Sequence, residues 1–143
     1  MEQKEGRTVR FGTPSVLALC PDLLFASKIR GAGAAAGVPV QLVRNQRALM
    51  DALEAEAEAE AAAAEGAPAP GRRLVLVDLG AAHDGAEAVG AAKQGFPDVE
   101  VVAFAPHVAA DRIQAARAAG ADVVLARSAF IVQLPGMLRA LKA

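Results

Sequence analysis

A carboxylate stands directly after one of the apolar runs of this chain. Residues 74–77 are an unbroken aliphatic stretch, and Asp78 follows them. Such a run, bounded by polar residues and glycine, is typical of a strand buried on both faces of a parallel sheet. Functional groups in these sheets gather just beyond the carboxyl ends of the strands. Asp78 is therefore the first candidate for a site; its plainer interpretation is a strand-end carboxylate that pairs with Arg127 or caps a loop.

A cysteine ends an earlier apolar run, at residues 15–19, and Pro21-Asp22 follows it. Cys20 thus stands before a helix start, where a thiol can have a lowered pKa and act as a nucleophile. The sequence offers no general base for it, so a plain buried thiol is favoured. His83 and His107 also follow strand-like runs, but they lack the close spacing of metal-ligand pairs. The sequence therefore predicts no metal site and no cofactor.

Strand-like and helix-like segments alternate along the chain. Strands are expected at residues 15–19, 38–43, 72–80, 99–104 and 122–126, and helices at 21–37, from Asn45 onward, at 84–94, at 108–119 and near the end of the chain. This alternation predicts an α/β domain with a five-stranded parallel sheet. Right-handed crossovers would wind it doubly, into a three-layer sandwich.

Two helical segments carry unusual features. After Leu49 and Leu53, which have helical spacing, residues 54–71 turn into alternating Glu and Ala and then into a Gly/Ala/Pro-rich stretch. Because this segment has no large apolar side chain to pack, it is predicted to be a surface insertion, an overrun helix followed by a mobile loop; a docking helix is the alternative. In the last helix, Pro135 is expected to mark the first turn, since proline disfavours a helix interior.

The composition limits the class of protein and its partners. The 143 residues include 15 Lys+Arg against 16 Asp+Glu, with one Cys and no Trp or Tyr. The balance of charge gives no reason to expect nucleic acid or a membrane as partner, and no run of about 18 apolar residues suits a membrane span. We expect a cytoplasmic protein with a flexible leader at residues 1–14 and a single domain at 15–143.

Several segments in register resemble one family. Residues 111–127 read D-R-I-Q-A-A-R-A-A-G-A-D-V-V-L-A-R and resemble the fourth helix and fifth strand of response-regulator receiver domains, which have the flavodoxin-like fold. L-V-L-V-D-L (74–79) is similar to the family's third strand, V-L-A-L-C-P-D (16–22) to its first strand, R-A-L-M-D-A-L (47–53) to its second helix, and F-A-P-H (104–107) to the end of its fourth strand. The resemblance spans residues 15–142, except for the insertion, and implies a role in bacterial two-component signalling.

The resemblance is weak at the positions that carry the family's chemistry. In receivers an aspartate accepts a phosphoryl group, with Mg²⁺ on neighbouring carboxylates and a lysine nearby, because only cations make the approach of phosphate oxygens to a carboxylate tolerable. Asp78 matches the acceptor. The acidic pair falls on Cys20 and Pro21, which are not hard oxygen ligands, and Asp22 lies one position later. The hydroxyl position is Phe104, the aromatic switch position is Val124, and the lysine position is Arg127.

These departures favour a degenerate pseudo-receiver, without catalytic residues, that works as a phosphorylation-independent protein-interaction module. By resemblance, its protein partner, or a second copy in a homodimer, would bind the face formed by the fourth helix, fifth strand and fifth helix, with Arg112, Arg117 and Asp122. One alternative is a phosphorylatable receiver that uses Asp22 together with Asp78. Another is a flavodoxin-like domain that binds a small ligand at the same strand ends.

Overall fold

The computed structural model describes residues 12–68, 71–106 and 108–142. Within them, five parallel strands form one sheet in the order β2-β1-β3-β4-β5. Five strands and five helices alternate, which confirms the predicted α/β class: β1 Ser15–Leu19, α1 Leu23–Ala36, β2 Val40–Val43, α2 Gln46–Ala61, β3 Arg73–Asp78, α3 Gly85–Gly95, β4 Glu100–Ala105, α4 Ala110–Ala119, β5 Val123–Ala126 and α5 Arg127–Lys142.

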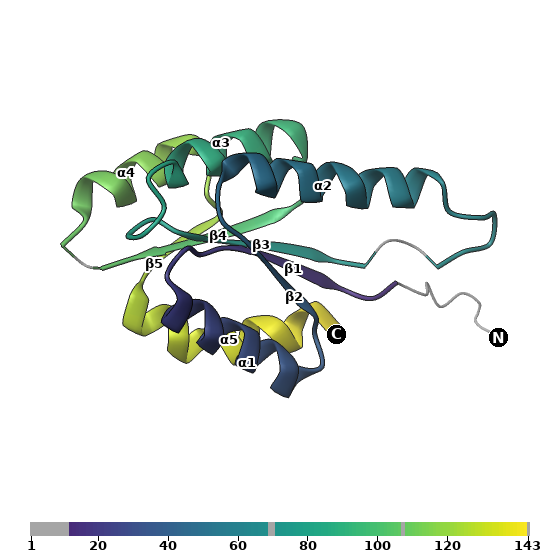
Figure 1. The fold of residues 1–143 in the computed structure, drawn as a ribbon, viewed down its shortest axis with the longest axis horizontal. Helices are drawn as coiled ribbons and strands as arrows, with labels where there is room; N and C mark the ends of the chain where they lie inside the picture. Colours follow the sequence, from purple (N-terminus) through teal and green to yellow (C-terminus); the bar gives the residue numbers. More distant parts are fainter. Residues whose placement is uncertain (1–11, 69–70, 107, 143) are drawn as a thin grey trace.

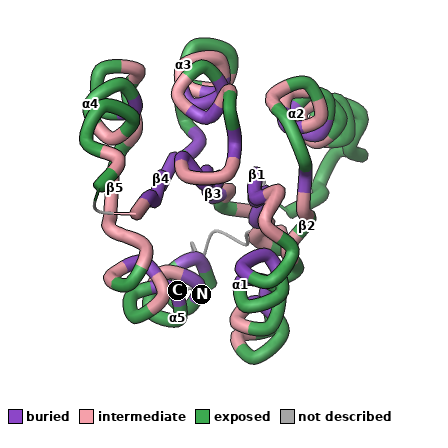
Figure 2. The backbone as a smooth tube through the Cα atoms, turned by 60° about the vertical axis from the view of Figure 1, so that its left-hand side comes forward, coloured by how far each residue is buried: buried purple, intermediate pink, exposed green. Residues whose placement is uncertain are grey.

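Helices cover both faces of the sheet and make three layers (Figure 1). α1 and α5 lie side by side on one face, and α2, α3 and α4 cover the other (Figure 2). Successive residues of a strand point to opposite faces. Val75 and Val77 of β3 therefore join the apolar core under α2–α4, whereas Leu74 and Leu76 join the core under α1 and α5. β3 lies at the centre of the sheet and ends at Asp78.

Part of the predicted leader lies outside the described residues. Residues 1–11 fall there, and residues 12–14 lead into β1 without forming a helix or strand. None of the helices in the described part of the chain has the length and apolarity needed to cross a bilayer.

Helix ends follow the capping residues of the sequence. Asp22 caps α1 by accepting from the backbone N–H groups of Leu24 and Phe25, and Gly37 ends that helix with a φ of 71°. Asn45 caps α2 as expected, accepting from the N–H of Ala48. α1 thereby begins right at the carboxyl end of β1, which brings Asp22 to the edge of the sheet where Asp78 lies.

The prediction for the last helix was wrong at its start. α5 begins at Arg127, immediately after β5, and Pro135 lies inside it. Phe130, Leu134 and Leu138 form a buried stripe of helical spacing that continues on both sides of Pro135. Burying these side chains outweighs the loss of one backbone hydrogen bond, and the proline ring lies on the exposed side. As a consequence, Arg127 belongs to the first turn of α5.

The Glu/Ala segment continues α2 as far as Ala61. Its acidic side chains have a partner that the sequence pattern did not indicate. Glu56 and Glu60, one helical turn apart, both form ion pairs with Arg73 at the start of β3. The Nε of Arg73 lies 3.6 Å from Glu56. This arginine holds the end of α2, which extends beyond the sheet in Figure 1, against the strand.

Replacing Arg73 with alanine should loosen the end of α2. A helical segment without large apolar contacts is marginal in water, so its order depends on these ion pairs. We expect a loss of about 0.5–1.5 kcal/mol in the free energy of unfolding and faster amide hydrogen exchange across residues 54–61. Arg47→Ala, at an exposed position of the same helix, is the control. Unchanged exchange in the Arg73 variant would contradict this role.

Candidate functional site

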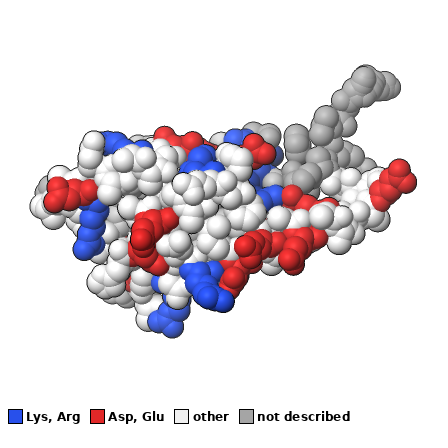
Figure 3. All heavy atoms as spheres, turned by 90° about the horizontal axis from the view of Figure 1, so that it is seen from above, with Lys and Arg blue, Asp and Glu red and all other residues white. Residues whose placement is uncertain are grey.

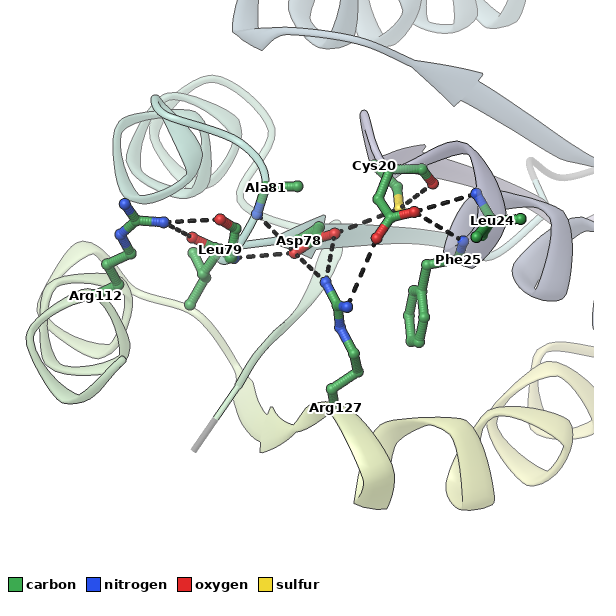
Figure 4. A network of polar contacts seen from close by, with 10 residues as sticks. Cys20, Leu24, Phe25, Asp78, Leu79, Ala81, Arg112 and Arg127 are labelled. Carbon is green, nitrogen blue, oxygen red and sulfur yellow. Dashed lines mark hydrogen bonds and ion pairs between the residues drawn. The ribbon is translucent and has the colours of Figure 1, made fainter. Parts of the chain in front are cut away.

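Four elements bring the candidate site together at the carboxyl edge of the sheet. Asp78 ends β3, Cys20 follows β1, Asp22 caps α1, and Arg127 opens α5. Figure 4 shows Asp78 in the middle of this network, with the side chains of Cys20 and Arg127 directed at it. Asp78 is 0% exposed and is the one fully buried polar or charged side chain among the described residues. A buried carboxylate of this kind is tolerated only where its oxygens are hydrogen-bonded.

Both oxygens of Asp78 have internal partners. Oδ1 accepts hydrogen bonds from the N–H groups of Gly80 (2.9 Å) and Ala81 (3.1 Å). Oδ2 accepts from Arg127, at 3.2 Å, and from the Cys20 thiol, at 3.5 Å. The carboxylate thus caps the loop after β3 and pairs with Arg127, and both halves of the plainer interpretation are present.

Arg127 bridges two carboxylates. Its Nη2 contacts Asp78, and its Nη1 lies 3.6 Å from Oδ2 of Asp22. The guanidinium also lies over the ring of Phe25, with 4.5 Å from Cζ to the ring centroid. A planar cation of this type suits both contacts, the paired carboxylates and the aromatic face. Phe25, in the first turn of α1, was not anticipated as part of the site.

Cys20 is a buried thiol, as favoured, and its pKa is not lowered. Burial, followed by the adjacent charge of Asp78, raises the pKa of Cys20 to about 12. The nearby carboxylate disfavours a thiolate and accepts the thiol hydrogen. Cys20 is therefore a neutral hydrogen-bond donor at physiological pH, which favours the plain buried thiol over the nucleophile.

This environment predicts that the Cys20 thiol is alkylated slowly in the native protein. Because the pKa lies about three units above that of a free thiol, we expect native Cys20 to react with iodoacetamide at pH 8 roughly a thousandfold more slowly than in urea-unfolded protein. An acid with a raised folded-state pKa stabilises the fold below its unfolded pKa and loses that contribution as pH rises towards 12. Cys20→Ala should accordingly lose less stability than the parent between pH 9 and 12. Equal labelling rates in native and unfolded protein would contradict the buried neutral thiol.

The Mg²⁺ implied by the resemblance does not fit these residues. Mg²⁺ requires several oxygen ligands in near-octahedral geometry. The side chains of Cys20 and Pro21 supply no oxygen, and Oδ1 of Asp22 already accepts from the N–H groups that it caps, at 3.1 and 3.2 Å. Across the described ranges, no group of three His, Cys, Asp or Glu side chains is arranged to hold a metal ion. His83 is exposed, and His107 lies outside those ranges.

The two switch-equivalent positions are part of the packing. Phe104 is 0% exposed, and its ring stacks on Phe130 with centroids 4.1 Å apart and lies 5.1 Å from Phe25. The three rings join β4, α5 and α1. Val124 is half-buried and packs against the core beneath α2–α4. Neither side chain can donate a hydrogen bond to Asp78.

The three residues predicted for an interaction face are not equivalent. Arg112 of α4 donates to the carbonyl oxygens of Leu79 (2.9 Å) and Gly80 (2.8 Å), and so holds the loop after Asp78. Asp122 accepts from the Val101 N–H at 2.7 Å and pairs with Lys93. All three residues are exposed, and Arg117 is the one of them that makes no polar side-chain contact within the described residues.

Asp122 joins α3, β4 and the start of β5. Burial acts to raise the pKa of its carboxyl, but the Val101 N–H and the Lys93 ammonium lower it below the ordinary value overall. Neither Lys93 nor Arg112 was anticipated in these roles. Both contacts join segments about 30 positions apart in the chain, and no local sequence pattern signals them.

Comparisons with known proteins were made at the levels of sequence and fold. The sequence matches no protein-family model and no curated protein. The structure is similar to a response regulator from Thermotoga maritima, with a TM-score of 0.65 and 18% identity over 91% of this chain and 98% of that one. It is similar to the receiver domain of NtrX from Brucella abortus (TM-score 0.66, 14% identity, 87% and 98% covered).

A third neighbour is the phosphorylated cyanobacterial phytochrome response regulator RcpA, with a TM-score of 0.60 and 20% identity over 92% of each chain. These structures share one architecture with the chain over nearly its whole length. Because the sequence identities are low, the structural likeness establishes the fold alone. The chain has the fold of response-regulator receiver domains.

Proposed function

We propose that this chain is a pseudo-receiver, a protein-interaction module in signalling that works without phosphorylation. The observation that carries the proposal is that both carboxylate oxygens of Asp78 are already hydrogen-bonded within the protein. These oxygens bind the loop N–H groups, the Cys20 thiol and Arg127, and Asp78 has no exposed surface. An incoming phosphoryl group would have to displace these partners without a divalent cation to offset its charge.

The packing at the switch positions supports the same proposal. By the resemblance, the buried ring of Phe104 and the half-buried Val124 occupy the hydroxyl position and the aromatic switch position. The domain is thereby held in one arrangement, and a partner would bind it constitutively. The face of α4, β5 and α5, with the exposed Arg117, is the surface that the resemblance suggests for a protein partner or a second copy.

A phosphodonor assay tests the proposal. The protein is incubated with acetyl phosphate and Mg²⁺, and its intact mass is measured; we expect no phosphorylated species. Asp78→Asn is the matched control. A phosphorylated species that disappears in this variant would overturn the proposal.

The main alternative is a phosphorylatable receiver in which Asp22 and Asp78 share a metal ion. It is favoured by the place of Asp78 at the end of β3 and by the phosphorylated neighbour RcpA. Titration with Mg²⁺, followed by NMR, separates the two functions. Amide shifts at residues 78–81 that saturate at millimolar Mg²⁺ would favour the alternative; the proposal predicts none.

A further inference from the structure

The two helical layers of the domain differ in charge. α1 and α5 contain no Asp or Glu, and their five charged side chains are all basic: Lys28, Arg30, Arg127, Arg139 and Lys142. α2, α3 and α4 together carry seven acidic and four basic side chains. Figure 3, the view onto the α2–α3–α4 layer, shows both signs mixed, with acidic side chains gathered towards the end where α2 extends. The nearly neutral chain thus has one distinctly basic side.

The basic layer also carries exposed aliphatic side chains. Leu23 and Leu24 of α1 are 75% and 83% exposed, and Val132 of α5 is 77% exposed. Of the five large exposed apolar side chains among the described residues, these three lie on two neighbouring helices, whereas Val108 precedes α4 and Val123 lies on β5. The grouping on α1 and α5 is a sign of an interaction surface. We call the exposed side of α1 and α5, with Leu24, Lys28, Val132 and Arg139, the α1–α5 face.

A cavity opens between these helices at the end of the face near Arg127. It has a volume of about 540 Å³, and its lining includes Leu24, Phe25 and Ile131 as apolar side chains and Lys28 as a basic one. This volume lies within the range of protein ligand sites and accommodates an aliphatic side chain. Arg127 and Asp22 also line the cavity, but they form an ion pair with one another, and Asp78 pairs with the same guanidinium. Lys28 is therefore the cation of the cavity available to an incoming charge.

The face suggested by the family resemblance also exposes apolar side chains, Val108 before α4 and Val123 on β5, but fewer of its charged side chains are free. On α4 and next to β5, Arg112 and Asp122 are both engaged within the molecule, by the loop carbonyls of residues 79–80 and by Lys93 and Val101. Within the described residues, no acidic side chain forms an ion pair with Lys28, Arg30 or Arg139. Charge and exposed apolar surface therefore coincide on the α1–α5 face.

We propose that the α1–α5 face binds an acidic peptide segment of a partner protein, with an aliphatic side chain of that segment inserted into the cavity beside Leu24. Carboxylates of the segment would lie near Lys28 and Arg139, where no acidic neighbour on α1 or α5 opposes them. Complementary charge of this kind speeds association and selects the partner, while the aliphatic anchor supplies apolar burial. This inference rests on the proposed interaction role and adds the surface and the chemistry of the partner.

A labelled synthetic peptide tests the proposal with the full chain. The probe is a fluorescein-tagged peptide of Glu-Leu-Glu-Glu repeats, and its binding is measured by fluorescence anisotropy at low salt. We expect saturable binding that weakens as salt is added. Peptides of Gln-Leu-Gln-Gln or Glu-Ala-Glu-Glu repeats should bind at least about tenfold more weakly, because one lacks the charge and the other lacks the anchor.

Variants locate the binding. Lys28→Glu combined with Arg139→Glu, and separately Leu24→Asp, should each weaken binding by about tenfold or more. Arg117→Glu, an exposed arginine on α4 in the other layer, should leave binding within about twofold. All these positions are at the surface, and circular dichroism is used to check that each variant is folded.

Several results would overturn the proposal. These are no saturable binding, equal binding of the Gln-Leu-Gln-Gln peptide, or an equal loss in Arg117→Glu. Tighter binding of anionic vesicles or DNA would assign the face to another class of partner, and self-association abolished by Lys28→Glu/Arg139→Glu would assign it to a second copy. None of these outcomes bears on the phosphodonor assay, so the proposed function and this inference can fail separately.

Discussion

Replacement of Arg127 with alanine is expected to lower the free energy of unfolding by about 2–4 kcal/mol. The variant removes the cation from Asp78, whose fully buried carboxylate would be left without a charged partner. Removing one member of a buried ion pair is costly for this reason. The expected value is lower than for a wholly buried pair, because the Arg127 side chain is 32% exposed and solvent screens part of the interaction. Urea denaturation provides the measurement.

A double-mutant cycle separates the ion pair from the other contacts of Arg127. Asn at position 78 can still accept hydrogen bonds from the N–H groups of Gly80 and Ala81, but it carries no charge. In an Asp78→Asn background, Arg127→Ala should therefore cost only about 1 kcal/mol, mainly from the lost contact with Phe25. Arg117→Ala is the control for loss of an exposed arginine. If Arg127→Ala lowered the free energy of unfolding equally in the parent and in the Asp78→Asn background, the ion pair with Asp78 would not be the contact that stabilises Arg127.

The sheet and the ion pair between Asp78 and Arg127 could be predicted from local features of the sequence. The aliphatic run at residues 74–77 has no polar interruption, which suits a strand covered on both faces, and β3 is such a strand. The carboxyl ends of parallel strands meet at a common edge, so an acid at the end of β3 and an arginine directly after β5 are brought to the same place. The contact between Asp78 and Arg127 could be predicted for this reason.

Other parts of the site depend on contacts that no local pattern records. Judged from the sequence alone, Pro135 indicates the start of a helix. In the structure, the burial of apolar side chains on both sides of Pro135 stabilises one continuous helix, α5. The thiol of Cys20 looks activated from its place before a helix, whereas its pKa is set by burial and by Asp78, 58 positions away. The bonds from Arg112 to the loop after β3 depend likewise on the packing of α4 beside α3.

These contacts together describe how the edge of the sheet is held. Two side chains bind the loop after β3. Asp78 accepts hydrogen bonds from the N–H groups of this loop, and Arg112 of α4 donates to its carbonyl oxygens. Arg127 ties the same carboxylate to the start of α5 and to the cap of α1. A loop fastened at its donors and its acceptors has few alternative arrangements, which agrees with the proposed constitutive module.

The second large effect is expected at Phe104. Phe104→Ala should lower the free energy of unfolding by about 3–5 kcal/mol, because it removes a fully buried ring and leaves a cavity. The cavity would lie against Phe25 and Phe130, the two rings through which α1 and α5 pack on β4. Phe96→Ala, at a half-buried ring that ends α3 away from this cluster, is the control and should cost less than half as much. Thermal and urea unfolding of the two variants measure the difference.

Phe104→Thr asks whether the position can accept the hydroxyl of the family pattern. Phe104 pairs with Asp78 in the β3–β4 register, and its carbonyl accepts from the N–H of Leu79, so the backbone there is already placed for a side chain beside the site. A threonine would still be as costly as alanine, since it leaves most of the cavity and buries a hydroxyl among aromatic rings. A Phe104→Thr variant within about 1 kcal/mol of the parent would mean that the cluster repacks readily. In that case the aromatic side chain would not hold α1 and α5 in one arrangement, and the packing support for a constitutive module would be lost.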